Sequence, residues 1–466
     1  MRARPGHWLR RKEVQANNGQ RAQIRLGHLV SSLIFHTHPS KGLQGQLRVA
    51  SDKSISHRSV ILGSIANGKT RIENLLEGED VLASIRAFRA MGVDIVRSME
   101  GHDPIYTIDG VGLDGLRAPD QDLDLGNSGT AFRLIAGLLS SQQFASTLTG
   151  DASLSKRPMS RIIEPLTQMG AVIHSAGGKP PLSIEPCERL SGIEFHPPVV
   201  SAQVKSSVLL AGLRASGETR FIETAPTRDH TETMLAGFGY PVMVSGTEIC
   251  LEGGHALTAT HVQVPADISS AAFFMVAALI VPDSRLRLND VGINPRRTGI
   301  LTILRRMGAD IKIENARMQG GEEVADLVIS SSELAGCEIS GDDVALAIDE
   351  IPVICIAAAA AKGETTIHGA EELRVKESDR IKAVAEGLQR LGIEAEERMD
   401  GMRIQGGKFR PAEIDSHEDH RIAMAFSVAG AVAEGDARIM KCSNVATSFP
   451  NFIELANQAG MGITLE

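Results

Sequence analysis

The chain has 466 residues, enough for about two ordinary domains, and 42% of them are hydrophobic, as in a typical globular protein. Its formal net charge of -9 is unevenly spread: residues 1–41 hold eight Lys and Arg but one acid, so the remainder carries 40 basic and 56 acidic residues, or -16. That charge and the 3% of aromatic residues argue against a nucleic-acid-binding protein, and no apolar run approaches the ~18 residues of a membrane span.

Residues 1–41 are predicted to form a disordered basic extension, and deletion of residues 1–40 is expected to change stability and turnover little. The Arg-rich, acid-poor composition is also typical of a transit peptide, so import into an organelle is the alternative to a cytoplasmic location. An intracellular location is indicated by the cysteines, none of which is part of a CxxC pair. They are Cys187, Cys250, Cys337, Cys355 and Cys442.

Beyond the extension, one unit recurs six times with a period of about 70 residues. Each copy has a helix rich in small apolar residues, a strand and a second, amphipathic helix that ends near a glycine. The first helices begin near Ser54, Ser128, Ser201, Ile268, Ile348 and Asp419, and the glycines are Gly92, Gly170, Gly239, Gly308, Gly392 and Gly460. These glycines suit the left-handed cap position, and the wholly apolar runs 271–280 and 356–361 predict buried helices. The pattern indicates an α/β protein with three units in each of two domains and a seam near residues 265–268.

Two nucleotide-binding patterns occur in contexts that do not fit them. Residues 63–70 match GxxxxGK[ST], but this run closes a predicted helix and opens a strand, whereas a phosphate-binding loop does the reverse. Residues 110–115 match GxGxxG, but a turn follows in place of the helix that a dinucleotide site requires. We therefore expect neither an NTPase nor a dinucleotide-binding enzyme, and the absence of HExxH and paired CxxC motifs predicts no metal site.

Basic and small polar residues gather at the predicted helix starts, where unpaired N–H groups and the helix dipole favour anions. The cluster comprises Lys53, Ser54, Arg58, Asn127, Ser128, Gly129, Thr130, Lys156, Arg157, Ser201, Gln203, Arg228, Lys376, Arg380, His420 and Arg421. It predicts a site for ligands with more than one anionic group. Two acids, Asp349 and Glu377, stand within it, and the pattern leaves open whether they cap helices or act as general acid and base.

At these residues the chain resembles the 5-enolpyruvylshikimate-3-phosphate synthases, in particular a bacterial branch, over about residues 43–463. The resemblance rests on DKSISHR at 52–58, LGNSGT at 125–130, GDASLSKRPM at 150–159, SAQVK at 201–205, TRDHT at 227–231, LRVKESDR at 373–380 and DHRIA at 419–423. It implies a two-domain inside-out α/β barrel of six βαβαββ repeats, with helix N-termini facing the cleft between the domains. The first domain is expected at 53–265, and the second at 42–52 plus 266–466.

The resemblance also implies the substrates, phosphoenolpyruvate and shikimate 3-phosphate. We expect no cofactor, no metal, no nucleic-acid or membrane partner, and a chain that acts as a monomer. The residues implied for shikimate 3-phosphate are Lys53, Ser54, Arg58, Ser201, Ala202, Gln203, Arg228, Asp349 and Lys376. Those implied for phosphoenolpyruvate are Lys53, Gly129, Arg157, Gln203, Arg380 and Arg421. For proton transfer we assign Asp349 as base and Glu377 as acid, with Lys53 as an alternative donor.

Two departures from the family pattern are Ala50-Ser51, where Pro-Gly is usual at a domain crossover, and Thr447, where the other branch has Lys. Insensitive members of the branch resembled here have Ala at the position of Gly129, so we expect this glycine to control inhibition by glyphosate. The alternative is a glycine required only for backbone conformation.

The repeats and motifs leave two alternative functions. One is UDP-N-acetylglucosamine enolpyruvyl transfer, for which Cys187 is the nearest candidate cysteine, although its acidic neighbours disfavour a thiolate. The other is a repeat-built binding ring or scaffold, and the charge of the body argues against a ring around DNA.

Overall fold

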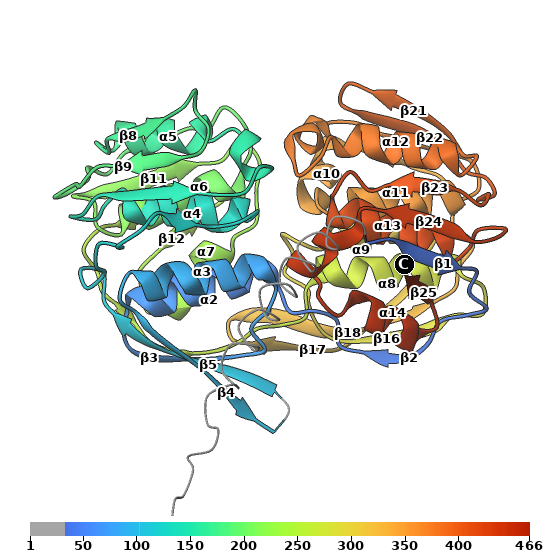
Figure 1. Cartoon of the computed structure of the whole chain (residues 1–466), viewed down its shortest axis with the longest axis horizontal. Coiled ribbons are helices and arrows are strands. Elements are labelled where there is room, and N and C mark those ends of the chain that lie inside the picture. Colours follow the sequence, from blue (N-terminus) through green and yellow to red (C-terminus); the bar gives the residue numbers. More distant parts are fainter. Residues whose placement is uncertain (1–32, 102) are drawn as a thin grey trace, which may run out of the picture.

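The computed structural model of the chain describes residues 33–101 and 103–466, which form two halves joined along one side (Figure 1). Within each half, the first helices of the three units pack together, and small sheets lie on their outer sides. We call residues 53–265 the first half and the remaining described residues the second half. In the described part of the chain, no helix is long and apolar enough to cross a membrane.

The first half contains three units and two further short strands, β14 and β15, which both pair with β3. Its elements are α2 (Lys53–Ile65), β3 (Ala66–Glu73), α3 (Glu79–Ala90), β4 (Asp94–Glu100), β5 (Asp103–Val111), β6 (Leu123–Asp124), α4 (Gly129–Leu139), β7 (Ser146–Thr149), η2 (Leu154–Lys156), α5 (Ser160–Gln168), β8 (Ile173–Ser175), β9 (Leu182–Ile184), β10 (Glu194–Phe195), α6 (Ala202–Gly212), β11 (Glu218–Ile222), α7 (His230–Gly237), β12 (Met243–Ser245), β13 (Glu248–Glu252), β14 (Leu257–Thr258) and β15 (His261–Gln263). The sheets are β14-β3-β5-β4 with β15 also on β3, β6-β7-β9-β8 and β10-β11-β13-β12.

The second half repeats this plan. Its elements are β1 (Phe35–His38), β2 (Gln44–Leu47), α8 (Ile268–Ile280), β16 (Arg285–Gly292), α9 (Gly299–Arg306), β17 (Asp310–Gln319), β18 (Glu322–Ser330), β19 (Glu338–Ile339), α10 (Gly341–Ala347), α11 (Ile351–Ala360), β20 (Glu364–Ile367), η3 (Glu371–Val375), α12 (Arg380–Arg390), β21 (Glu394–Arg398), β22 (Gly401–Gln405), β23 (Glu413–Asp415), α13 (His420–Gly430), β24 (Ala437–Met440), η4 (Cys442–Thr447), α14 (Phe452–Ala459) and β25 (Gly462–Leu465). The sheets are β17-β18-β16-β2, β19-β20-β22-β21 and β23-β24-β1-β25.

The six predicted units are thus present as six sheets with paired helices. All six predicted cap glycines have positive φ, between 75° and 106°, because only glycine enters this region without strain. The apolar helices α8 and α11 are almost entirely buried, as predicted. One boundary differs: the fifth first helix, α11, begins at Ile351, so Asp349 lies in the turn after α10 and does not start a helix.

Neither nucleotide-binding pattern forms the strand–loop–helix structure that such a site requires. Residues 63–70 end α2 and open β3, and Gly68 lies inside the strand. After β5 ends at Val111, the next helix in the described chain is α4, which begins at Gly129. The rejection of both motifs is therefore confirmed.

The chain crosses between the halves twice, at neighbouring points. Ser51 and Ala266 form a β-bridge there, Asp52 N donates to Pro265 O at 2.8 Å, and Asp267 N donates to Ala50 O at 2.9 Å. Because β2 pairs with β16 and β15 pairs with β3, the N-terminal strands belong to sheets of the second half, while the strands before the second crossing return to the first unit.

The predicted extension is wrong at its C-terminal end. Residues 35–38 form β1, which lies between β24 and β25, and Phe35 is 1% exposed and stacks near Phe452. An apolar side chain at this position is drawn into the core, so residues 33–41 belong to the fold. The interpretation of residues 1–32 as a disordered or transit segment lies outside the described residues.

Candidate active site

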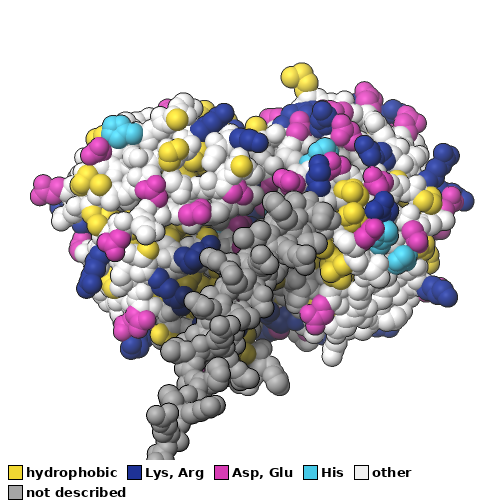
Figure 2. Space-filling model, in the orientation of Figure 1, with side chains coloured by type: hydrophobic (Ala, Val, Ile, Leu, Met, Phe, Trp, Pro, Cys, Tyr) yellow, Lys and Arg dark blue, Asp and Glu magenta, His cyan; other side chains and the backbone are white. Residues whose placement is uncertain are grey.

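Three of the predicted arginines are buried, whereas Lys156 is exposed, and on the face in Figure 2 acidic and basic side chains are interspersed. Arg380 is 1% exposed, Arg58 4% and Arg157 7%. A buried guanidinium group requires an anionic or strongly polar partner. The contacts of these groups therefore show which anions the site accommodates.

Polar side chains cap the helices that begin near the candidate site. Ser128, Ser201 and Asp419 cap α4, α6 and α13, each through a side-chain oxygen that accepts a backbone N–H of the first turn. A cap satisfies one of the four N–H groups that have no partner within the helix. The others can bind an anion.

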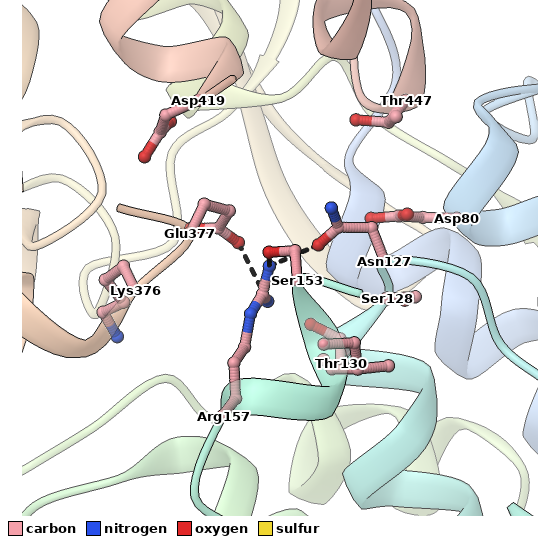
Figure 3. Close-up of polar contacts among 12 residues, drawn as sticks. Asp80, Asn127, Ser128, Thr130, Ser153, Arg157, Lys376, Glu377, Asp419 and Thr447 are labelled. Atoms are coloured by element: carbon pink, nitrogen blue, oxygen red, sulfur yellow. Dashed lines mark hydrogen bonds and ion pairs between the residues drawn. The ribbon is translucent and has the colours of Figure 1, made fainter. Parts of the chain in front are cut away.

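Arg157 links the two halves. Its Nη1 lies 3.3 Å from Oε1 of Glu377, and its Nη2 donates to Asn127 Oδ1 and to Ser153 Oγ, the latter at 3.4 Å (Figure 3). Arg380 Nη2 donates to the other oxygen of Glu377 at 2.6 Å. The carboxylate of Glu377 thus lies between two guanidinium groups that a small dianion could also bind.

Asp349 forms a second contact between the halves. It pairs with Arg228 of the first half, and its Oδ1 lies 3.4 Å from Nη1 of Arg380. Arg421 Nη1 donates to the backbone oxygen of Asp349 at 2.8 Å, and its Nη2 lies 3.8 Å from Oδ2. Together with Arg157 and Glu377, these residues form one continuous group of charges.

Both carboxyl groups are held ionised. Burial raises the pKa of each, but neighbouring cations outweigh it, Arg228 most for Asp349 and Arg380 most for Glu377, so both pKa values lie well below the usual range. In this arrangement both groups are unprotonated. Neither can donate a proton until the arginines are drawn to another anion.

The first turns of α4 supply a further arginine, Arg133, that the sequence did not reveal. Arg133 Nη1 donates to Gln203 Oε1 at 2.7 Å, and Gln203 Nε2 donates to Thr130 Oγ1 at 3.0 Å. Burial, helped by the charge of Arg157, lowers the pKa of Arg133 to about 10. Its position four residues after Gly129, on the same helical face, is the signal that could have identified it.

Gly129 opens α4 and is not among the glycines with positive φ. Backbone conformation therefore does not explain it. A Cβ atom there would lie 2.8 Å from Nη1 of Arg133 and 3.1 Å from Nη1 of Arg157. The glycine leaves room between two guanidinium groups.

Two predicted lysines have acidic neighbours. Lys53 pairs with Asp80 and donates to Ser448 Oγ of the second half at 3.0 Å. Lys376 Nζ lies 3.5 Å from Glu372 Oε1, and burial lowers its pKa. Asp80 was missed from the sequence because its motif, unlike those around the lysines, contains no basic or small polar run.

Arg58 is held inside the first half. Its Nε donates to Thr231 Oγ1 and its Nη2 to Ser206 Oγ, both at 2.7 Å, while Nη1 donates to the backbone oxygen of Ser54 at 3.0 Å. Ala202 is the first residue of α6 beside it. Among the contacts of the described residues, none joins Arg58 directly to the group around Glu377.

Further residues complete the surroundings. Asp419 is fully buried, and its Oδ2 accepts from Arg380 Nε at 2.8 Å. A narrow cavity is lined by Asp80, Asn127, Glu377, Glu418, His420, Asn444 and Thr447. Cys187 is not part of it: its N–H bonds Gln142 O, beyond the opposite end of α4.

Known proteins match this chain over most of its length. Residues 37–455 match the family described as EPSP synthase (3-phosphoshikimate 1-carboxyvinyltransferase). The 3-phosphoshikimate 1-carboxyvinyltransferases of Alkalilimnicola ehrlichii and Methylococcus capsulatus are each 57% identical over 432 residues, covering 92% of this chain and 96% and 98% of theirs. A solved structure of EPSP synthase from Acinetobacter baumannii has a TM-score of 0.83 at 52% identity and covers 93% of this chain and 100% of its own.

Proposed function

The chain belongs to the EPSP synthase (3-phosphoshikimate 1-carboxyvinyltransferase) family, and on this premise we propose how its residues carry out the reaction. The enzyme transfers the enolpyruvyl group of phosphoenolpyruvate to shikimate 3-phosphate, as the sequence predicted. The two-domain inside-out α/β fold is likewise confirmed. The alternatives, a UDP-N-acetylglucosamine enolpyruvyl transferase and a non-catalytic scaffold, are set aside.

For phosphoenolpyruvate, we assign the group of cations around Glu377. Arg157 and Arg380 contact this carboxylate from opposite halves, and Lys53 and Arg421 lie at the same interface. A phosphate and a carboxylate could replace the protein acids on these cations, since guanidinium groups bind both in forked geometry. Gly129 and Gln203 are assigned to the same ligand.

For shikimate 3-phosphate, we assign residues that approach from both halves. Arg228 of the first half and Asp349 of the second are in contact, and Lys376 contributes a further buried cation. The remaining assigned residues are Lys53, Ser54, Arg58, Ser201, Ala202 and Gln203.

The chemistry needs one base and one acid. The 5-hydroxyl oxygen of shikimate 3-phosphate attacks C2 of phosphoenolpyruvate while its proton passes to Asp349, and C3 gains a proton from Glu377. The tetrahedral adduct then expels phosphate, which takes up the proton from Asp349, while C3 returns its proton to Glu377 and the double bond is restored. Lys53 is the alternative donor.

Substrate binding itself would prepare the acid. The pKa of Glu377 is low because Arg380 and Arg157 face it. If the anionic groups of phosphoenolpyruvate engage these arginines and bring negative charge beside Glu377, its pKa rises and the carboxyl can take up the proton that it must donate. By the same reasoning, the contact with Arg228 sets the pKa of Asp349 and therefore its strength as a base.

The observation that supports the assignment most directly is the pair of contacts Arg157–Glu377 and Arg228–Asp349, which bring both substrate sites to one interface. The test is a coupled assay of phosphate release from phosphoenolpyruvate with either shikimate 3-phosphate or UDP-N-acetylglucosamine as acceptor. Turnover with the first acceptor alone is expected. Release with the second alone would refute the assignment of the acceptor site.

We further propose that the enzyme acts as a monomer in the cytoplasm. All residues assigned to both substrates come from one chain, and the relatives cited above are bacterial. All five cysteines are unpaired, as expected of a reducing compartment. Light scattering at assay concentrations would reveal any stable dimer.

A further inference from the structure

A buried polar network lies where the chain crosses between the halves, outside the assigned binding residues. Its centre is Arg297, in the segment between β16 and α9, which is 3% exposed. The guanidinium group makes four hydrogen bonds. Nη1 donates to Asp52 Oδ2 at 3.3 Å and to His230 Nε2 at 3.2 Å, and Nη2 donates to Asp267 Oδ1 at 3.2 Å and to Ser269 Oγ at 2.8 Å.

Two of these partners cap helices that begin at the chain crossings. Asp52 caps α2 by accepting from Ile55 N at 2.8 Å, and the next residue is Lys53. Asp267 caps α8 by accepting from Ser269 N at 3.0 Å. One guanidinium group therefore connects the caps of the first helix of each half, at the two chain crossings.

The third partner anchors the other side of the first half. His230 opens α7 two residues after Arg228, and its Nδ1 lies 2.8 Å from Oε1 of Glu322 on β18 of the second half. Because Nε2 accepts from Arg297, Nδ1 carries the proton and donates to Glu322. Asn294 reinforces the same contact, since its Nδ2 donates to Asp229 Oδ1 at 2.8 Å.

The fourth partner leads back to the candidate base. Ser269 donates to Glu350 Oε1, and Glu350 is buried directly beside Asp349 in the chain. Arg421 Nη1 lies 4.0 Å from the same oxygen of Glu350. The network thus runs from the residue before Lys53, through Arg297, to the residue after Asp349.

We propose that Arg297 is a positioning residue for the enolpyruvyl transfer, which holds Lys53 and Arg228 of the first half in register with Asp349 of the second. This rests on the proposed function, because the positioned residues are those assigned to the substrates. The charges of the network support this role, because the buried carboxylates of Asp52 and Asp267 share the one guanidinium group of Arg297. Burial together with Asp52 raises the pKa of Asp267 to about 6. The two carboxylates therefore need the positive charge of Arg297 to stay ionised together.

The test compares Arg297→Gln, Arg297→Lys and the control Arg214→Gln. Arg214 is also largely buried and pairs with Asp114, but both lie within the first half and far from the crossings. We expect Arg297→Gln to lower kcat by about tenfold to a hundredfold per folded molecule, the size of effect that a misplacement of about 1 Å produces. Arg297→Lys should recover part of it, and Arg214→Gln should leave kcat unchanged.

Two further readouts separate positioning from stability. Arg297→Gln should weaken shikimate 3-phosphate binding and reduce the compaction that this ligand causes in small-angle scattering, whereas a purely structural role would lower the melting temperature and leave both as in wild type. If Arg297→Gln does not fold, the same measurements are made on His230→Phe. This variant removes the hydrogen bond between Arg297 and His230 but keeps a buried ring at the same position. Wild-type kcat and compaction in the folded variant would overturn the proposal, while an inactive wild type would refute the proposed function instead.

Discussion

Arg157 Nη1 lies 3.3 Å from Glu377 Oε1, although the two residues are 220 positions apart and belong to different halves. The contact joins a cation assigned to phosphoenolpyruvate to the acid assigned to its protonation. We therefore expect the binding of phosphoenolpyruvate to be coupled to the approach of the two halves.

Shikimate 3-phosphate is expected to favour the arrangement in which the halves touch. Arg161 Nη1 lies 2.8 Å from Glu372 Oε2 across the same interface, and neither residue is assigned to a substrate. Because this pair is partly exposed, Arg161→Glu should weaken ligand binding by about fivefold or less. Adding Glu372→Arg should restore it, as measured by calorimetry and by the ligand-induced fall in the radius of gyration. A double variant no better than the single one would contradict this.

Asp349→Asn should lower turnover by roughly 10²- to 10⁴-fold, the usual range for general acid–base catalysis. The amide preserves the shape of the side chain, so cooperative thermal unfolding should be retained. Asp343→Asn is the matched control, because Asp343 pairs with Arg306 on α10 and α9, away from both substrates. Nearly full turnover in Asp349→Asn would eliminate it as the base.

The sequence revealed the repeated units because period and apolar pattern are local properties. The cap glycines such as Gly92 and the buried helix α8 followed for the same reason. It could not place β1, since Phe35 pairs with strands some 400 residues later and a four-residue strand has no pattern of its own. The sequence likewise could not show that Arg297 contacts Asp52, because that contact depends on the two points where the chain crosses between the halves.

Deletion of residues 1–32 should leave turnover unchanged, whereas deletion of 1–40 should destabilise the protein strongly. The longer deletion removes β1 from the middle of a sheet, and burial of Phe35 alone contributes about 2 kcal/mol. Phe35→Ala in the full chain is the intermediate case and should lower the free energy of unfolding by about 3–5 kcal/mol. Denaturant titration checks all three, and equal stability of both deletions would show that β1 is dispensable.

Stability should decline as the pH falls below about 6.5, because of buried neutral histidines. Burial, and then Lys53 and Arg58, hold the pKa of His57 well below the usual range, so in acid the unfolded chain binds a proton that the native protein does not. The contribution of neutral His57 to the free energy of unfolding is fully present above the pKa that this histidine has in the unfolded chain. It falls by about 1.4 kcal/mol per pH unit as the pH decreases below that value. His57→Gln should flatten the slope between pH 6 and 4.5 by that amount. The exposed His174→Gln is the control, and an unchanged slope in His57→Gln would count against the assignment.

Glyphosate is expected to compete with phosphoenolpyruvate, and Gly129 to determine how well. A methyl group at Gly129 would lie 2.8 Å from Nη1 of Arg133 and 3.1 Å from Nη1 of Arg157, so it narrows the space between two guanidinium groups, of which we assign that of Arg157 to phosphoenolpyruvate. Overpacking of this kind typically costs about 1–3 kcal/mol. Gly129→Ala should therefore weaken the binding of glyphosate roughly 10- to 100-fold and raise the KM for phosphoenolpyruvate less, because the inhibitor is longer than the natural donor.

Inhibition by glyphosate is measured at fixed shikimate 3-phosphate with varied phosphoenolpyruvate. Gly237→Ala, where a Cβ meets nothing within 4 Å, is the matched control. Equal shifts of both constants, or a wild type that already resists millimolar glyphosate, would show that Gly129 does not set the selectivity.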